Sequence, residues 1–253
     1  MPEGIGNLAN RMEADFQIQP FETGVLGVPV GRLRLADAAG RLPAGLGRLI
    51  SVWRRDGVWL VSCRVDKGAP AIGGLEKNGF KAIETLVTLR RDLSDKPAAQ
   101  VDDATPADHD AIVAIARRAF TMDRLHRDGR VPADAADAVR EQWIRNDLEG
   151  RADASLIVRD GSAVAGFILC LLDGGEAVID LIAVDVARQK KGIGRALVAG
   201  AVAHYAGRAR AMRVGTQADN EASLKMYRAV GFAEATRQVT LHWINPEAAP
   251  VAS

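Results

Sequence analysis

Residues 178–205 read VIDLIAVDVARQKKGIGRALVAGAVAHY, and this stretch decides the fold. Its first seven residues, Val178 to Val184, are apolar except for Asp180, which is typical of a buried strand. A turn that holds Gly192 and Gly194 follows, and the residues after it place apolar side chains at helical spacing. The stretch therefore predicts a strand, a glycine turn and a helix, in that order.

The predicted turn lies at a helix N-terminus, where the first backbone N–H groups have no partner within the helix and the dipole is positive. Glycines let an anion approach the backbone closely, so the turn is a candidate site for a phosphate or pyrophosphate. A dinucleotide fingerprint is excluded because Leu197 stands where its third glycine is required. A Walker loop is excluded because its Gly-Lys-Ser/Thr sequence is missing here.

Length and composition predict one large or two modest domains, since the chain has 253 residues and 48% of them are hydrophobic. Its 33 basic and 32 acidic residues leave a net charge of +1, which gives no electrostatic reason to expect a nucleic-acid or membrane partner. Cys63 and Cys170 lie in separate apolar stretches, so we interpret them as buried reduced thiols and not as a disulfide or a metal site. With neither a signal peptide nor a membrane span indicated, we expect a cytoplasmic protein without a metal.

A weak internal repeat relates the two ends of the chain. Residues 75–89 (LEKNGFKAIETLVTL) align with residues 227–241 (YRAVGFAEATRQVTL), and five positions are identical, including Gly79/Gly231 and Phe80/Phe232. Both copies predict a helix end, a glycine with positive φ, a buried Phe and a strand. We therefore expect residues 1–98 to form a smaller degenerate copy of the domain in residues 99–253, with a linker at 94–106 and a short disordered tail from Asn245.

The remaining elements follow from periodicity and turn residues. In the first half we expect strands at 25–35, 58–65 and 81–90, and a helix that ends near 78. In the second half we expect helices at 106–120, 134–148 and 220–230, and strands at 155–159, 163–172, 213–217 and 236–243.

Two separated motifs resemble the GNAT superfamily of N-acetyltransferases over residues 107–243. One is the Gln189-x-x-Gly192-x-Gly194 loop after a strand. The other is the closing segment VGTQADNEASLKMYRAVGF, where Asn220 starts a helix and Tyr227 precedes a Gly-Phe pair. The resemblance implies an α/β GNAT fold, with a mixed central sheet flanked by helices and a smaller degenerate GNAT-like α/β domain before it. It also implies acetyl-CoA as co-substrate.

The resemblance assigns the residues that bind acetyl-CoA. The backbone of the central strand and the glycine turn supply most of them, the two loop lysines add positive potential, and Asn220 both caps its helix and touches the pantetheine arm. The set is Ile182, Ala183, Val184, Gln189, Lys190, Lys191, Gly192, Ile193, Gly194, Arg195, Asn220 and Tyr227.

Acetyl transfer to an amine requires an acid for the leaving thiolate and a base for the amine. Tyr227 is the candidate acid, because a phenol stays protonated at neutral pH and its reference pKa of about 10 is close to that of a thiol; the alternative is a packing tyrosine. Asp180 is the candidate base, because it interrupts an apolar strand and so faces a cleft or solvent. Glu176, Asp173 and His126 are rival bases.

A narrower resemblance concerns the acceptor. The segment Asp123–His126, the helix around Trp143 and the pair Thr216-Gln217 resemble the TDP-fucosamine acetyltransferases. This implies a small-molecule acceptor, the amino group of a nucleotide-linked amino sugar, bound by Arg124, His126, Trp143 and Gln217. Leu125 and Gly129 depart from the family's pattern, which has an aromatic residue and a proline there.

Other functions stay open on the sequence. The acceptor could be another small amine or a protein N-terminus, and the chain could also be a non-catalytic acyl-CoA-binding protein. The presence of Tyr227 argues against the last of these. The sequence leaves a homodimer open.

Overall fold

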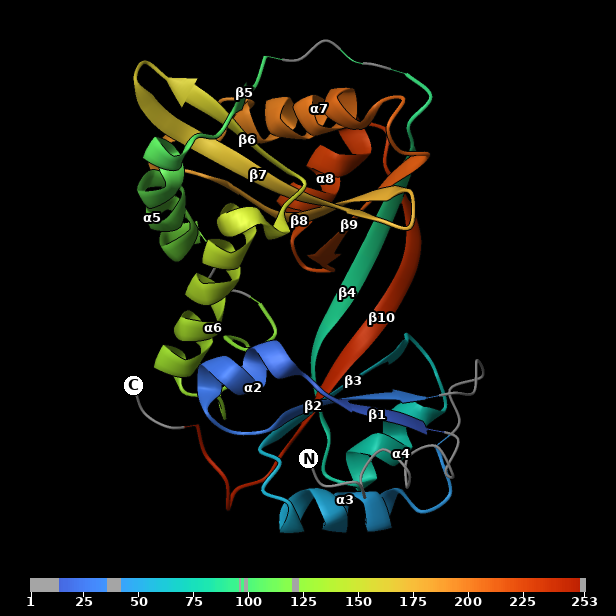
Figure 1. Ribbon diagram of the computed structural model, residues 1–253. Coiled ribbons are helices and arrows are strands. Elements are labelled where there is room, and N and C mark those ends of the chain that lie inside the picture. The colour runs from blue at the N-terminus through green and yellow to red at the C-terminus, as the bar shows by residue number, and fades with distance from the viewer. Residues whose placement is uncertain (1–13, 36–41, 96, 98–99, 120–122, 251–253) are drawn as a thin grey trace. The chain divides into compact units, whose positions relative to one another are not determined.

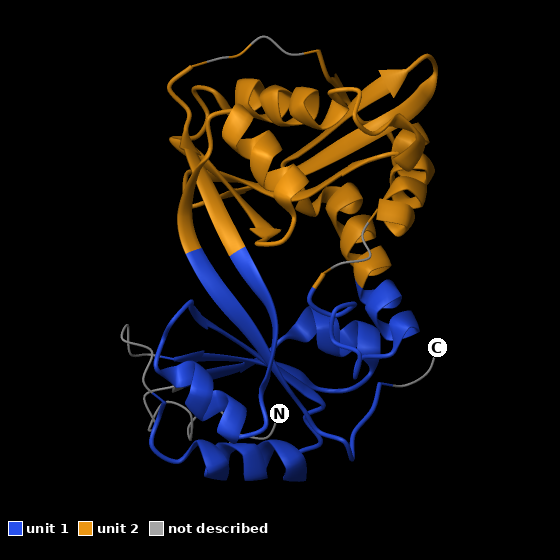
Figure 2. Cartoon of the chain, turned by 180° about the vertical axis from the view of Figure 1, so that it is seen from behind, with its two compact units in different colours: residues 1–86, 124–139, 237–253 blue, residues 87–123, 140–236 orange. Residues whose placement is uncertain are grey.

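A computed structural model describes residues 14–35, 42–95, 97, 100–119 and 123–250 (Figure 1). The chain forms two compact units (Figure 2). The first unit comprises residues 1–86, 124–139 and 237–253, and the second comprises residues 87–123 and 140–236. These units divide the chain differently from the domains predicted at 98/99, since two later segments cluster with the first unit.

The first unit is a small α/β structure. Its elements are β1 (Ala14–Ile18), α2 (Pro20–Leu26), β2 (Val30–Leu35), α3 (Leu46–Arg55), β3 (Leu60–Asp66) and α4 (Ala71–Lys77). The start of β4 (Lys81–Asp92), the start of α6 (Ala133–Asn146) and the end of β10 (Ala233–Ile244) complete it. In its sheet β2 pairs antiparallel with β1 and parallel with β3, and β10 pairs antiparallel with β3.

Apolar residues cover each side of this sheet differently. On one face, helices α3 and α4 pack through Leu49, Trp53 and Leu75 against strand residues that include Cys63 and Leu241. A separate cluster joins α2 and the start of α6 to the residues that precede β2 and β3. Because side chains alternate along each strand, the polar residues of these strands lie on the face opposite α3 and α4.

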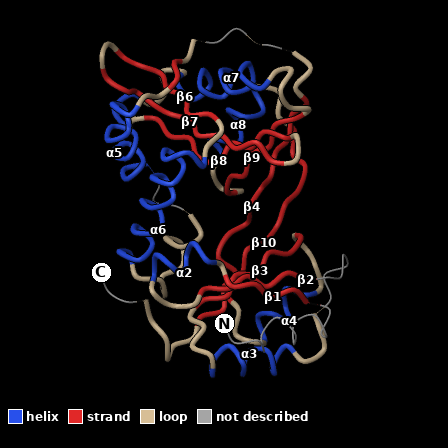
Figure 3. Tube along the Cα trace, viewed as in Figure 1, coloured by secondary structure: helices blue, strands red, loops and turns tan. Residues whose placement is uncertain are grey.

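The second unit holds a larger sheet with helices on both faces (Figure 3). After β5 (Asp102–Asp103) come the short 3-10 helix η1 (Pro106–Asp108) and α5 (His109–Ala119), and the end of α6 continues into the π-helical turn η2 (Asp147–Arg151). Then follow β6 (Ala154–Asp160), β7 (Ala163–Asp173), β8 (Glu176–Val184), the 3-10 helix η3 (Val186–Arg188), α7 (Ile193–Tyr205), β9 (Ala211–Gln217) and α8 (Glu221–Ala229). The strand order is β9-β8-β7-β6-β5, parallel between β8 and β9 and antiparallel elsewhere.

Two cores hold the second unit together. Helices α7 and α8 bury Leu197, Val202 and Leu224 against one face of the sheet. Helices α5 and α6 bury Ile112 and Ile144 against the other face. The mixed sheet flanked by helices agrees with the predicted fold class.

The repeat is visible in the local structure. Gly79 (φ 87°) follows α4 and Gly231 (φ 86°) follows α8. The N–H of Phe80 donates to the Leu75 carbonyl at 3.1 Å, and the N–H of Phe232 donates to the Tyr227 carbonyl at the same distance. The predicted sequence of helix end, left-handed glycine, buried Phe and strand is thus confirmed at both places, whereas the descent of the first unit from a second GNAT domain stays a prediction.

Several predicted elements were wrong. Residues 25–35 do not form one strand, because Gly27 (φ 65°) ends α2 and the strand begins only at Val30. β1 and α3 were not predicted, and β5 lies inside the predicted linker. The tail is ordered as far as residue 250: Asn245 is buried and its N–H donates to the Trp59 carbonyl at 2.8 Å. Residues 251–253 lie outside the described residues.

The two cysteines are buried free thiols, as predicted. Burial raises the pKa of Cys63 to about 12, which keeps this thiol protonated. Within the described ranges, no helix is long and apolar enough to cross a membrane, and no group of three or more His, Cys, Asp or Glu side chains is placed to hold a metal.

Candidate active site

The glycine turn precedes α7 as predicted. Gly192 is the N-cap of the helix and adopts a left-handed conformation (φ 82°), and Lys190 does so too (φ 63°). No side chain caps this helix, so the N–H groups of Ile193, Gly194 and Arg195 at its first positions have no intrahelical acceptor. Lys190, Lys191 and Arg195 are exposed beside them. The turn therefore fits an anion that accepts hydrogen bonds from backbone donors.

Gly194 is required for a different reason. A Cβ atom added at this position would lie 2.8 Å from the Met226 sulfur on α8, so any larger residue would displace that side chain. Ile193 and Met226 both pack against the core that α7 shares with the sheet. The second glycine thus lets the start of α7 approach α8 closely.

Strand β8, which leads into this turn, contains a β-bulge at Asp180. Its neighbours Ile179 and Leu181 pair with Cys170 and Leu169 of β7, so that Asp180 has no partner opposite it. The bulge reverses the alternation of the strand: Ile179 faces the core under α7 before it, and Ile182 faces the same core after it. The strand is apolar on both sides of Asp180 because both of its faces are covered.

β8 and β9 separate at the same point. Their parallel ladder runs from Glu176 opposite Ala211 to Ile179 opposite Val214, and within the described strands it continues no further. The residues of β8 beyond the ladder, including Ile182, Ala183 and Val184, therefore have backbone groups on that side without a strand partner. This gap in the ladder is where a ligand could pair with the strand backbone.

Asp180 is half-buried at this opening and is held by two donors. The Trp143 indole N–H and the Arg151 guanidinium each donate to Asp180 Oδ2 at 2.7 Å. The Arg151 guanidinium also lies over the Trp143 ring, 5.5 Å from its centroid. Both of these donors contact the same carboxylate oxygen, Oδ2.

Asp147, which we did not predict, completes this cluster. Its side chain is buried, and its Oδ1 accepts a hydrogen bond from the same Arg151 that binds Asp180. Its Oδ2 is buried without a hydrogen-bond partner in the described part of the chain. Burial first, and then the neighbouring charge of Asp180, raise the pKa of Asp147 to about 7. Asp147 therefore gains or loses a proton near neutral pH.

Tyr227 lies on α8 and is buried. Its ring packs 5.8 Å from that of Phe232, and no described side chain forms a hydrogen bond to its hydroxyl. Burial, with a smaller contribution from Cys170, raises the pKa of Tyr227 well above its usual value. The hydroxyl thus stays protonated at neutral pH, which both the acid and the packing interpretation require.

The rival bases have other partners. Glu176 accepts hydrogen bonds from Arg90 and Arg210, which lower the pKa of its carboxyl. Asp173 is bound by Arg213 at 2.6 Å. His126 lies 3.0 Å from an oxygen of Asp137 in the first unit. Asp180 is likewise bound by an arginine, so its role as the base stays a prediction.

The remaining predicted residues fall in both units. Asn220 accepts a hydrogen bond from the Ser223 N–H at 3.1 Å, so its role as N-cap is confirmed. Gln217 ends β9, and its carbonyl accepts from the Asn220 N–H at 3.0 Å. Asp180, Trp143, Gln217 and the α7 turn belong to the second unit. Arg124 and His126 belong to the first unit.

Arg124 has a partner there. Its guanidinium donates to Glu22 at 2.8 Å, and this pair is largely buried. The neighbouring Arg130 is bound to Asp128 at 2.8 Å and to the His242 carbonyl. Arg124 lines a pocket of the first unit, whereas Arg130 does not.

Comparison with known proteins agrees with this arrangement. Residues 110–232 match the model of the acetyltransferase (GNAT) family. Over 145 residues the chain is 30% identical to the spore coat polysaccharide biosynthesis protein SpsD of Bacillus subtilis, covering 56% of this chain and 50% of that protein. Over 170 residues it is 29% identical to a mycothiol acetyltransferase of Mycobacteroides abscessus, covering 63% of this chain and 56% of the relative. The chain thus spans about half the length of these curated relatives.

Among solved structures, a GCN5-related N-acetyltransferase from Sphaerobacter thermophilus superposes with a TM-score of 0.63 at 17% identity, covering 91% of this chain and 76% of that one. This similarity and the family match confirm the predicted GNAT fold. The relatives support the prediction of an acyl-CoA-dependent N-acyltransferase, and they leave the acceptor undetermined.

Proposed function

We propose that the chain is an N-acetyltransferase that moves the acetyl group of acetyl-CoA to a primary amine. One observation carries this proposal: the β8–β9 ladder ends beside the bulged Asp180, in the strand that leads into the uncapped N-terminus of α7. An opened strand edge beside a carboxylate, followed by an anion-binding turn, suits a substrate that has both a thioester and a pyrophosphate.

Acetyl-CoA supplies an acetyl group activated as a thioester. Around it, the N–H groups at the start of α7 would bind the pyrophosphate, and Lys190, Lys191 and Arg195 would add positive charge near the phosphates. The unpaired N–H groups of β8 near Ile182 would donate to the thioester oxygen, where negative charge develops. The Tyr227 hydroxyl would protonate the leaving sulfur.

Asp180 would take the proton of the amine at Oδ1, the oxygen that Trp143 and Arg151 do not contact. Trp143 and Arg151 hold the carboxylate in place through its other oxygen. Asp147 would carry a proton for part of the time near neutral pH, because its carboxyl is buried beside the charge of Asp180. We therefore infer that the charge of Asp180 helps to keep a proton on Asp147.

We infer further that the acceptor is a small molecule, and specifically a nucleotide-linked amino sugar. The name of the Bacillus subtilis relative points to polysaccharide biosynthesis, and that of the Mycobacteroides abscessus relative to a small-molecule acceptor. Arg124 supports the nucleotide-linked form, because a guanidinium matches the geometry of a phosphate. The nucleotide would present two phosphates close to the sugar amine.

The test is thiol release from acetyl-CoA with a panel of amines: nucleotide-linked amino sugars, the free amino sugars, peptides and a polyamine. We expect turnover with the nucleotide-linked sugars and at least tenfold lower kcat/KM with the others. Preference for a peptide or a free amine would overturn the sugar proposal and leave the acetyltransferase proposal standing. Binding of acetyl-CoA without thiol release from any amine would favour the non-catalytic alternative.

A further inference from the structure

The sheet of the first unit has a polar face that the α7 site does not use. Along β2, β3 and β10, Leu33, Cys63 and Leu241 point into the core under α3 and α4. The residues between them therefore point to the opposite face, because side chains alternate along a strand. That face carries Arg32, Arg34, Ser62, Arg64, Gln238 and Thr240.

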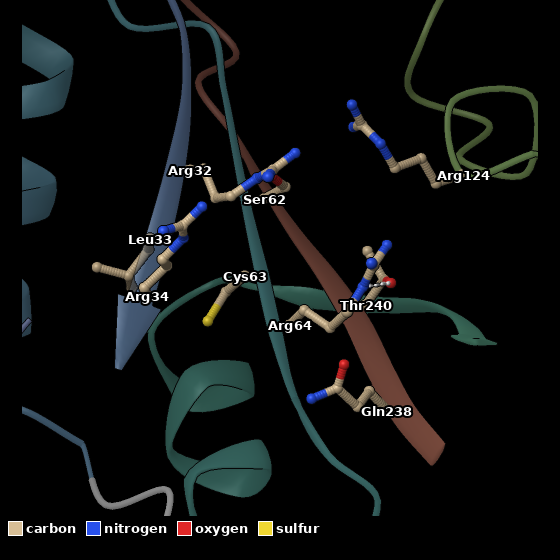
Figure 4. A pocket seen from close by; sticks show the side chains of 9 residues that line it. All are labelled: Arg32, Leu33, Arg34, Ser62, Cys63, Arg64, Arg124, Gln238 and Thr240. Carbon is tan, nitrogen blue, oxygen red and sulfur yellow. Dashed lines mark hydrogen bonds between the residues drawn. The ribbon is translucent and has the colours of Figure 1, made fainter. Parts of the chain in front are cut away.

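These side chains line a pocket of about 210 Å³ (Figure 4). Arg32 and Arg34 reach it from β2, Arg64 from β3, and Arg124 from the segment before α6. Arg64 donates to the Thr240 hydroxyl at 3.2 Å, which fixes one wall. Four guanidinium groups thus share one small pocket within a single unit.

Carboxylates neutralise only part of this charge. Glu22 binds Arg124 at 2.8 Å, and Glu84 lies 3.9 Å from Arg64. Among the described residues, neither Arg32 nor Arg34 has a carboxylate oxygen within 4.0 Å, although Asp15 stands opposite Arg34 in the β1–β2 ladder. Two of the four positive charges therefore lack a direct counter-ion in the pocket.

The arginines are close enough to affect one another. Burial lowers the pKa of Arg32, the charges of Arg124 and Arg34 lower it further, and Glu22 partly offsets this lowering. Burial likewise lowers the pKa of Arg64; Glu84 opposes this, and Arg124 and Arg32 add to it. Like charges held together in this way repel each other, and an anion between them would remove the repulsion.

We propose that this pocket binds the phosphoryl groups of a small molecule, and that the ligand is a diphosphate. Guanidinium groups pair with phosphate oxygens through two parallel hydrogen bonds, and several of them around one pocket favour this anion over a single carboxylate. The two charges without counter-ions equal the two negative charges of a diphosphate diester. This anion site rests on the pocket of the first unit alone and not on the proposed function.

The experiment is calorimetric titration of the full chain with inorganic pyrophosphate, and separately with inorganic phosphate and with a nucleoside diphosphate. Saturating CoA is present throughout, so that the α7 turn is occupied. The variants are Arg32→Gln and Arg34→Gln, and the matched control is Arg48→Gln, an exposed arginine on α3 outside the pocket. Melting temperatures show whether each variant is folded.

We expect pyrophosphate and the nucleoside diphosphate to bind, with Kd raised at least tenfold by Arg32→Gln or Arg34→Gln and unchanged by Arg48→Gln. Equal affinity in all folded variants, or no binding at all, would overturn the site. Phosphate binding as tightly as pyrophosphate would overturn the diphosphate assignment.

Turnover separates this inference from the proposed function. Unchanged pyrophosphate affinity in folded Arg32→Gln, in a chain that acetylates an amine, would overturn the pocket while acetyl transfer stands. Diphosphate binding that depends on Arg32, in a chain that acetylates no amine, would overturn the function while the pocket stands.

Discussion

At the scale of single residues, the buried carboxyl of Asp147 has the clearest consequence. Its pKa in the folded chain is about 7, whereas an unfolded Asp titrates near 4. Between these values the folded state binds more protons than the unfolded state. The free energy of unfolding therefore falls as pH rises from about 4 to about 7, and this contribution is constant above that range.

We predict that Asp147→Asn removes this slope, because an amide does not titrate. Urea denaturation at a series of pH values between 4.5 and 8 would measure it. Asp103→Asn, at an exposed aspartate of the same unit, is the control and should leave the slope unchanged. A slope in Asp147→Asn equal to that of the natural chain would refute the assignment.

Tyr227 and Tyr205 are the two tyrosines of the chain and form a natural comparison. As general acid, Tyr227 should contribute roughly 10² to 10⁴ in rate, so Tyr227→Phe should lower kcat by that factor with unchanged affinity for acetyl-CoA. The Tyr205 hydroxyl donates to Asp153 at 2.8 Å, so Tyr205→Phe should lower the free energy of unfolding by about 1 kcal/mol. It should leave kcat unchanged. Near-normal kcat in Tyr227→Phe would mean that the tyrosine only packs.

The sequence exposes some of these residues and hides others. Asp180 stands out because it breaks an apolar run, and Gly192 because the spacing of the loop is distinctive. Asp147 lies among ordinary helix residues, and only the fold brings it to Arg151. Arg32, Arg34 and Arg64 come from strands that are distant in sequence from Arg124, so no local pattern could group them.

At the scale of elements, the proposed binding of acetyl-CoA depends on the start of α7. Gly192 (φ 82°) and Gly161 (φ 64°), in the β6–β7 turn, are both left-handed, and a Cβ added to either would meet no atom within 4 Å. Alanine should therefore cost each position roughly 1 to 2 kcal/mol in backbone strain.

We predict that Gly192→Ala weakens acetyl-CoA binding at least tenfold and that Gly161→Ala, with similar strain, does not. Calorimetry on both folded variants would measure the difference. Equal affinities would show that the turn before α7 does not bind the pyrophosphate.

The same scale explains which elements were predicted. Residues 178–205 were predicted as strand, turn and helix because β8 is covered on both faces and α7 has a continuous apolar side. Residues 25 and 26 were predicted as strand and residues 20–24 were given no helix, although Pro20 at the first helical position and Gly27 after the last one mark a short helix. No glycine or proline marks the bulge at Asp180 in the sequence. Its position could therefore not be predicted from the strand pattern alone.

At the scale of the whole molecule, each compact unit is built from segments that alternate along the chain with segments of the other unit. The first unit takes residues 124–139 and 237–253 from beyond the second unit's first segment, and Leu241 and Trp243 belong to its core. We predict that residues 1–98 alone do not fold cooperatively, because these buried side chains would be missing. Near-ultraviolet circular dichroism with thermal unfolding would test this against the full chain. A cooperative transition in the fragment would show that a degenerate domain ends near residue 98 after all.

The four tryptophans are divided unevenly between the units. Trp53, Trp59 and Trp243 lie in the first unit, and Trp143 lies in the second. Since the Trp143 indole N–H donates to Asp180 and the Arg151 guanidinium, which also binds Asp147, covers its ring, its emission should be quenched or shifted when Asp147 changes charge. The chain thus carries its own optical reporter: a fluorescence change on titration through neutral pH that disappears in Trp143→Phe would read the protonation of Asp147 directly, without labelling.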